Sequence, residues 1–233
     1  MPRLLKSLVV AGLAVACASL SGGNFEHRSE AVTPASNPNA RPAADGRVSP
    51  RLAKPRIEPV EKESWNDAQR ALLEPIDKAG RLYNVHKTIA NHPKLARDWL
   101  TFATYVLRDN SLPVRDREIL ILRIGWLCQA DYELAQHARI GKRAGLTDDD
   151  IKRISNGPDA AGLSDHERLL LRAADELHED ACVSDATWKG LAMTYSTQQM
   201  MDLVFTVGEY NLVSMALNSF GVQLDEGLEP FPK

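Results

Sequence analysis

Two side chains, Glu133 and His137, stand four residues apart in a stretch whose apolar spacing predicts a helix. Residues four apart lie on the same face of a helix, one turn from each other. A carboxylate beside an imidazole orients the ring, selects its tautomer and raises its basicity. The pair therefore has the composition of a general acid–base site, although the same spacing also occurs in ordinary exposed pairs on helix surfaces.

A further acidic residue, Glu118, precedes Glu133 by 15 residues. On one straight helix this separation would span about 22 Å, which is too far for the two carboxylates to share a site. Glu118 can join the pair only if the chain turns between Leu127 and Asp131, and Asp131 is a plausible cap for a new helix. A Glu within an otherwise apolar helix also needs a partner for its charge. A three-residue site therefore requires a break between two helices.

The elements that carry these residues are predicted to be helices. From Trp65 onward apolar residues recur at helical spacing, and no stretch alternates long enough to indicate a half-buried strand. The run 119–127 has the β-branched content of a buried strand, but its length and the turn before it favour a central helix. Capping residues predict helix starts at Ser64, His92-Pro93, Ser111 with Pro113, Thr147, Ser164, Ser184 and Ser196. The sequence therefore predicts an all-α domain of about seven or eight helices.

The N-terminal region differs from the rest of the chain. Arg3 and Lys6 precede an uncharged stretch whose apolar part, Leu8 to Leu20, is too short for a confident membrane-spanning helix. A basic start, a short apolar run and small residues after it are typical of a secretory signal. We therefore expect a signal peptide over 1–18 and an exported protein, periplasmic or secreted. Cys17 could instead carry the lipid anchor of a lipoprotein, and a mis-assigned start codon or a disordered tail would also explain the stretch.

Residues 19–55 are rich in Ser, Asn, Ala, Pro and Arg and nearly lack large apolar side chains. Such a stretch cannot bury enough surface to offset the entropy lost on ordering it. We therefore predict a disordered tether over 19–55 and one helical domain over 56–233.

The overall composition excludes several classes of protein. The 233 residues carry 28 Lys and Arg against 31 Asp and Glu, and this net charge of −3 gives no electrostatic reason to expect nucleic-acid binding. Three cysteines are too few for a disulfide-stapled mini-protein or a four-cysteine zinc module. The remaining histidines show no mutual metal-ligand spacing. We expect a small-molecule substrate, with no metal, no cofactor and no membrane span.

Five motifs are spread along the predicted domain. They are Leu112-Pro113 with Asp116-Arg117-Glu118, then Trp126-Leu127-Cys128, Asp131-Tyr132-Glu133 with His137, Ala144-Gly145-Leu146-Thr147, and Tyr210-Asn211-Leu212-Val213-Ser214-Met215-Ala216-Leu217-Asn218. Together they resemble the carboxymuconolactone decarboxylase / alkylhydroperoxidase-D-like superfamily over about residues 56–228. The resemblance implies a helical fold of the alkylhydroperoxidase-D-like type and a homo-oligomer such as a trimer or hexamer.

The resemblance also bears on the reaction. Peroxidase members of that superfamily carry a Cys-x-x-Cys-x-x-x-His motif with a Glu 19 residues before the His. By position, His137 matches the His and Glu118 the Glu, whereas Ala130 and Glu133 stand where the cysteines would be. Cys128 lies two residues before the first of these positions. Thiol-based peroxide reduction needs an attacking thiolate and a resolving thiol, so the resemblance favours the decarboxylase-like members.

What the resemblance implies is a cofactor-free acid–base enzyme that decarboxylates or isomerises a small lactone or carbonyl acid. Its expected catalytic residues are Glu118, Glu133 and His137. Its expected substrate-binding residues are Tyr132, Arg123, Asn211 and Asn218. Arg123, or Arg139 in its place, could hold an anion, although a surface salt bridge is the common role of such residues.

Three alternatives remain open from the sequence. The polar positions Asn211, Ser214 and Asn218 on an apolar helix suit a hydrogen-bonded subunit interface as well as a pocket. The activity could instead be that of an alkylhydroperoxidase-like peroxidase, an antioxidant peroxiredoxin activity that would depend on Cys128. The protein could also be a non-catalytic helical oligomer.

Overall fold

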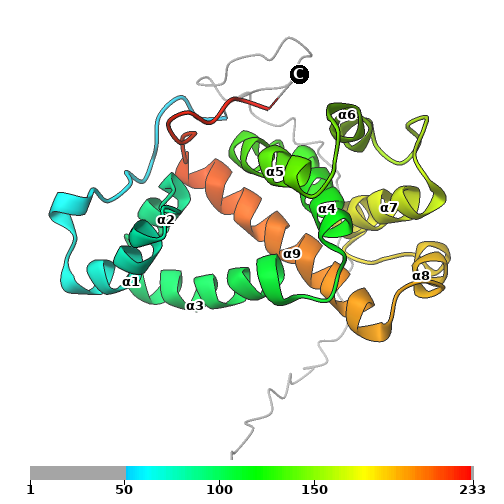
Figure 1. Ribbon diagram of the computed structural model, residues 1–233, viewed down its shortest axis with the longest axis horizontal. Coiled ribbons are helices and arrows are strands. Elements are labelled where there is room, and N and C mark those ends of the chain that lie inside the picture. The colour runs from blue at the N-terminus through cyan, green and yellow to red at the C-terminus, as the bar shows by residue number, and fades with distance from the viewer. Residues whose placement is uncertain (1–50, 232–233) are drawn as a thin grey trace, which may run out of the picture. The chain divides into compact units, whose positions relative to one another are not determined.

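The most apolar stretch of the sequence forms a central helix, α4 (Val114–Leu127), in the computed structural model, which describes residues 51–231. Every side chain from Asp116 to Ile124 is buried. The burial arises because α4 packs against four other helices: α5 (Asp131–Arg143), α6 (Asp148–Asn156), α7 (Asp165–Asp180) and α9 (Thr197–Phe220) (Figure 1). The prediction of a central helix rather than a strand at this position is confirmed.

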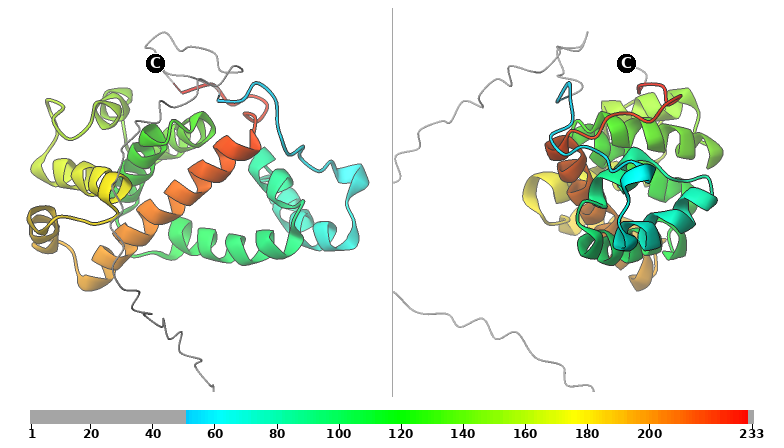
Figure 2. Two further views of the ribbon diagram at one scale, coloured as in Figure 1. Left: turned by 180° about the vertical axis from the view of Figure 1, so that it is seen from behind. Right: turned by 90° about the vertical axis from the view of Figure 1, so that its left-hand side faces the viewer.

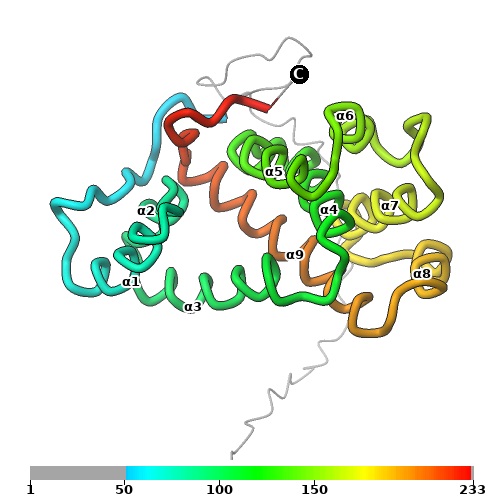
Figure 3. The backbone as a smooth tube through the Cα atoms, in the orientation of Figure 1, coloured from blue at the N-terminus to red at the C-terminus, as the bar shows by residue number. Residues whose placement is uncertain are grey.

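The helices before and after this group complete the fold. Three helices precede α4: α1 (Asp67–Lys78), α2 (Asn84–Ile89) and α3 (Pro93–Thr104), the last of which continues into a π-helical turn, η2 (Tyr105–Asp109). A further helix, α8 (Asp185–Ala192), joins α7 to α9. In Figures 2 and 3, α9 runs diagonally between α1–α3 and the α4–α8 group. The described residues contain nine α-helices and no strand, which confirms the all-α prediction, and none of these helices is long and apolar enough to cross a membrane.

Most predicted helix boundaries are confirmed by side-chain caps. The side chains of His92, Thr147, Ser164, Ser184 and Ser196 each accept a backbone N–H in the first turn of a helix. Three boundaries differ from the prediction. Ser111 caps no helix, because its hydroxyl donates to Asp202, and α4 begins directly after Pro113. The first helix is capped by Asn66 rather than Ser64, since Asn66 and Gln69 bond reciprocally, and α5 begins after Ala130 rather than Asp131. The short α2 was not predicted, because six residues are too few to show a helical period.

A tight turn between α4 and α5 brings the two helices together. Gln129, directly after the C-cap Cys128, has a φ of 51°, in the left-handed region that usually holds Gly. Further along, a Cβ on Gly141 would lie 3.8 Å from the Cβ of Glu118, which shows how closely α5 approaches α4 there. The break between helices that the three-residue site requires is therefore present.

The segment before α1 contacts this same region. Leu52 is buried, and Arg51 donates a hydrogen bond to the carbonyl oxygen of Cys128 at 3.1 Å. Residues 51–55, which the sequence analysis assigns to the tether, thus lie against the helical domain. The predicted signal peptide 1–18, the lipid-anchor candidate Cys17 and the tether residues 19–50 lie outside the described residues.

Replacing Gln129 by Gly should raise the free energy of unfolding by about 0.5–1 kcal/mol, measured by urea denaturation. A residue with a Cβ is strained by roughly 1–2 kcal/mol in the left-handed backbone conformation. Gly relieves this strain, but its larger conformational entropy in the unfolded state cancels part of the stabilisation. Gln129→Ala is the matched control, because it also removes the side-chain amide but keeps the Cβ, and it should bring no gain. Equal stability of the two variants would contradict the strain.

Candidate active site

Three buried side chains from α4 and α5 meet in a line. His137 Nδ1 lies 2.7 Å from Glu118 Oε2, and His137 Nε2 lies 3.0 Å from Glu133 Oε1. Glu118 has no exposed surface, and His137 and Glu133 are each about one-twentieth exposed. The structure therefore brings together all three residues that the sequence analysis assigns to catalysis. We call them the Glu118–His137–Glu133 chain.

The guanidinium group of Arg117 completes the charge balance of the Glu118–His137–Glu133 chain. The Nε and Nη2 atoms of Arg117 each lie 3.3 Å from Glu118 Oε1. Burial alone lowers the pKa of His137, but the carboxylates of Glu118 and Glu133 outweigh it and raise that pKa from 6.5 to about 10. At neutral pH the ring is therefore an imidazolium that donates from both nitrogens. Two carboxylates, one imidazolium and one guanidinium sum to zero charge in the interior.

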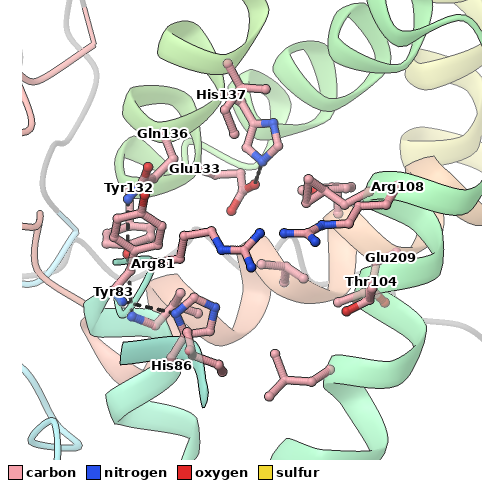
Figure 4. A pocket seen from close by; sticks show the side chains of 18 of the residues that line it. Arg81, Tyr83, His86, Thr104, Arg108, Tyr132, Glu133, Gln136, His137 and Glu209 are labelled. Atoms are coloured by element: carbon pink, nitrogen blue, oxygen red, sulfur yellow. Dashed lines mark hydrogen bonds and ion pairs between the residues drawn. The ribbon is translucent and has the colours of Figure 1, made fainter. Parts of the chain in front are cut away.

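One end of the Glu118–His137–Glu133 chain opens into a cavity of about 520 Å³, a size common among small-molecule sites. Glu133 and His137 line it, whereas Glu118 lies behind them. Figure 4 shows the contact between Glu133 and His137 at the cavity wall. Most of the lining is apolar, with contributions from α1, α2, α3, η2, α5 and α9. A bound molecule would therefore meet the carboxylate of Glu133 in a mainly apolar enclosure.

A second carboxyl group, Glu209 of α9, also lines the cavity. It is buried and accepts a hydrogen bond from the indole Nε1 of Trp99 at 2.7 Å, which joins α9 to α3. Burial raises the pKa of Glu209, and the negative charge of Glu133 raises it further. The sequence analysis missed Glu209, because nothing in the periodicity of α9 indicates that this polar residue would lie opposite α3.

Two tyrosines fix the surroundings of His137. The ring of Tyr210 packs edge-to-face on the imidazole with centroids 4.9 Å apart, and burial raises the pKa of its hydroxyl well above the usual range. Tyr132 lines the cavity, as expected for a substrate-binding residue. Its hydroxyl, however, donates to Asp225 Oδ2 at 2.6 Å, and burial raises its pKa as well. Both side chains are neutral phenols that shape the site.

Comparison with a family model assigns the central part of this architecture. Residues 93–176, which run from α3 into α7 and include the whole Glu118–His137–Glu133 chain, match the Carboxymuconolactone decarboxylase family. This match and the structural likenesses below confirm the resemblance. The resemblance is to the superfamily of carboxymuconolactone decarboxylase and AhpD. That superfamily includes enzymes, so an enzymatic role is supported in general terms, while the specific reaction is not.

Solved structures share the fold of this chain. The AhpD core of a peroxidase-related protein from Ralstonia eutropha is 20% identical, with a TM-score of 0.64, and the match covers 74% of this chain and 94% of that one. A peroxidase-related protein from a Silicibacter species is 14% identical, with a TM-score of 0.63 and coverages of 76% and 97%. The debrominase Bmp8, as a cysteine-to-alanine variant with 2,3,4-tribromopyrrole, is 13% identical, with a TM-score of 0.62 and coverages of 75% and 94%. At these identities the likeness shows the fold alone, and a comparison with curated proteins gives no match.

Three predicted substrate-binding residues lie away from the cavity. Arg123 points to the opposite side of α4, where its guanidinium bonds both carboxylate oxygens of Asp175 at 2.5 and 2.9 Å. Asn218 donates to the carbonyl oxygen of Cys128 at 2.9 Å, and Asn211 Oδ1 lies 3.0 Å from Cys128 Sγ. None of the three lines the cavity. Arg123 instead ties α4 to α6 and α7, and the two asparagines tie α9 to the C-cap residue of α4.

The cavity also holds cationic groups that the sequence analysis did not single out as a set. They are Arg81 in the α1–α2 loop, Arg108 in η2, and Arg139 and Arg143 in α5. Only Arg139 was considered as an anion-binding residue, in place of Arg123, and it does line the cavity. No spacing in the sequence relates Arg81 to Arg108, because their proximity depends on how α1–α3 fold over α5 and α9.

The free energy of unfolding should fall as the pH rises from about 6.5 to about 10. In that range unfolded His137 loses its proton while folded His137, with its raised pKa, keeps it, so folding becomes less favourable. Denaturant unfolding at pH 6, 8 and 10 measures this slope. The neutral variant His137→Gln should show a shallower slope than the wild type, and an identical slope would contradict an imidazolium at this position.

Proposed function

We propose that the protein is a cofactor-free acid–base enzyme that decarboxylates or isomerises a small lactone or carbonyl acid. The observation that carries the proposal is the Glu118–His137–Glu133 chain, a buried line of hydrogen-bonded groups that ends at the cavity. Such a chain can supply or accept a proton at Glu133 without exposing the reaction to bulk water.

Glu133, rather than His137, is the group that meets the substrate. Both nitrogens of His137 are held by carboxylates, so the ring has no free lone pair with which to act as a base. Glu133 uses Oε1 for that contact, which leaves Oε2 as the oxygen that exchanges a proton with a molecule in the cavity. His137 then serves as a proton reservoir, and Glu118 with Arg117 keeps its charge compensated.

Glu209 is the second carboxyl group that faces the substrate, beside Glu133. Because burial raises its pKa, it retains a proton more readily than an exposed Glu, and a neutral carboxyl group can donate a hydrogen bond to a substrate carbonyl. Such a bond stabilises the negative charge that develops on the carbonyl oxygen when a neighbouring carbon loses a proton or CO₂. The two carboxyl groups thus have different roles, with Glu133 moving the proton and Glu209 holding the enolate oxygen.

The proton balance follows for both reactions. In a decarboxylation the C–C bond to the carboxylate breaks, CO₂ leaves, and the electron pair passes to the conjugated carbonyl as an enolate. A proton moves from His137 through Glu133 to the substrate carbon, and solvent later restores it. In an isomerisation Glu133 takes the proton from one carbon and returns it to another position of the conjugated system, with no net exchange.

Glu133→Gln and His137→Ala should each lower turnover by about a hundredfold or more in a screen of small lactone and keto acids, because each interrupts proton transfer. Glu209→Gln should lower it less, since an amide still donates a hydrogen bond. Glu176→Gln is the matched control, because this carboxylate bonds Ser184 and Thr187 outside the cavity. Unchanged turnover in both Glu133→Gln and His137→Ala would remove these residues from the mechanism. A screen in which the wild type turns over nothing would favour the non-catalytic oligomer.

Peroxide reduction is the competing candidate, favoured by the description of two similar structures as peroxidase-related. Its sulfur would have to be Cys128, which is buried, lies beside Asn211 and does not line the cavity. Burial also raises the pKa of its thiol, which disfavours the reactive thiolate.

If the acid–base proposal is correct, the wild type should consume no hydroperoxide in the presence of a dithiol. Hydroperoxide loss is followed spectrophotometrically for the wild type and for Cys128→Ser. Consumption that disappears in Cys128→Ser but persists in Cys182→Ser, the control at the exposed free cysteine, would establish the peroxidase instead.

We further propose that the protein is exported and forms a homo-oligomer. Export is supported by the signal-like residues 1–18, with the lipid anchor at Cys17 as its variant form. Self-association is supported by a face of α9 whose large apolar side chains are half exposed, namely Met201, Phe205, Leu212 and Met215. Contiguous exposed apolar surface commonly marks a protein contact.

A further inference from the structure

Two guanidinium groups at the cavity have no anionic partner. Arg81 and Arg108 both line it, both residues are exposed to solvent, and neither side chain forms a hydrogen bond or an ion pair with any residue in the described part of the chain. Arginines elsewhere on this domain, such as Arg115, Arg123 and Arg153, are paired with carboxylates. The guanidinium groups of Arg81 and Arg108 are therefore available for a ligand.

The two groups converge from separate elements. Arg81 belongs to the loop between α1 and α2, and Arg108 to η2 after α3. Figure 4 shows both guanidinium groups extending into the cavity toward each other, on the side of the labelled Glu133. Two like charges that face each other repel, and an anion between them would turn that repulsion into two attractive contacts.

The rest of the cavity reinforces its positive charge. Arg139 and Arg143 also line it, and the Nε atom of Arg139 is buried without a hydrogen-bond partner. Of the two carboxyl groups at the cavity, Glu133 is paired with the imidazolium of His137, and burial of Glu209 favours its neutral form. The cavity is thus cationic although the whole chain has a net charge of −3.

A neutral donor stands beside Arg81. The ring of His86 lines the cavity, and its Nδ1 accepts a hydrogen bond from the backbone N–H of Tyr83 at 3.1 Å. Burial lowers the pKa of His86 to about 4, so the ring is neutral and its single proton sits on Nε2. His86 therefore adds a hydrogen-bond donor to the cavity and no acceptor, because its other nitrogen is occupied.

We infer that Arg81 and Arg108 hold a carboxylate of the substrate that does not react, and so select acids that carry an anionic group apart from the reacting carbon. The inference rests on the proposed function only for the reacting end of the molecule. The planar guanidinium matches the two oxygens of a carboxylate, and each group comes from a different element, so the anion also ties the α1–α2 loop to η2. Apolar side chains between the polar groups, including Trp99, Leu107 and Val213, contact the carbon skeleton.

Binding of an unreactive dicarboxylate tests the inference without any need for turnover. We choose adipate as the probe, measured by isothermal titration calorimetry at low salt, with the uncharged diamide of the same acid and inorganic phosphate as comparison ligands. Adipate should bind the wild type, and Arg81→Gln and Arg108→Gln should each weaken it about 10–100-fold, as expected for the loss of a charge-assisted contact. The diamide should bind more weakly than adipate by a similar factor.

The control variant is Arg172→Gln, because Arg172 is an exposed arginine whose contact, with Asp159, lies outside the cavity. It should leave adipate affinity unchanged. Equal adipate affinity in the wild type, Arg81→Gln and Arg108→Gln would overturn the inference, as would the absence of adipate binding. Phosphate binding that exceeds adipate binding and depends on the same two arginines would overturn the assignment to a carboxylate.

The same measurement separates this inference from the proposed function. Adipate binding to Glu133→Gln should still depend on Arg81 and Arg108, since the two arginines do not depend on proton transfer. Arginine-dependent adipate binding together with unimpaired turnover in Glu133→Gln and His137→Ala would leave the carboxylate site intact and remove the acid–base proposal. Loss of turnover in Glu133→Gln and His137→Ala, together with no adipate binding by the wild type, would support the acid–base proposal and overturn the carboxylate site.

Discussion

The structure around the cavity depends on one interaction, an imidazolium held between two buried carboxylates. Glu118 and Glu133 are both buried, and each carboxylate bonds one ring nitrogen of His137, whose charge offsets the cost of burying them. The ring in turn keeps its proton only because both carboxylates are present. This mutual dependence requires α4 and α5 to lie close together, and the tight turn at Gln129 between the two helices allows it.

The N-terminal helices α1–α3 form part of the cavity at which the Glu118–His137–Glu133 chain ends. Without α1–α3, the carboxylate of Glu133 would lack an opposite wall. The Trp99–Glu209 hydrogen bond fixes α3 against α9 and places a second carboxyl group in the same enclosure. These helices also have a small hydrophobic core of their own, formed by Trp65, Leu73 and Ala90. The Glu118–His137–Glu133 chain thus faces a wall formed in part by helices that have a core of their own.

Much of the fold was predictable from the sequence because its signals are local. Helical periodicity and capping side chains such as Ser164 and Ser196 depend on neighbours within one turn. The spacing of Glu133 and His137 is equally local, and the resemblance supplied Glu118. Glu209 and the arginine pair were not predictable, since their positions depend on packing between helices far apart in the sequence. Arg123 has the composition of an anion-binding residue, but its anion is Asp175, which lies 52 residues later in the chain.

Residues 51 and 52, which precede the predicted start of the helical domain, contact that domain. Arg51 donates to the carbonyl oxygen of Cys128, and Leu52 packs close to Gly221, where a side chain on that glycine would collide with it. The first described residues thus contact both the end of α4 and the end of α9. A truncated protein that starts at residue 56, where the composition changes, would lose these contacts. They lie at the turn between α4 and α5 that brings Glu118 close to Glu133. The folded domain therefore extends beyond the part of the sequence with a helical apolar pattern. Residues 51–55 contribute few apolar side chains to the core, yet they contact both α4 and α9.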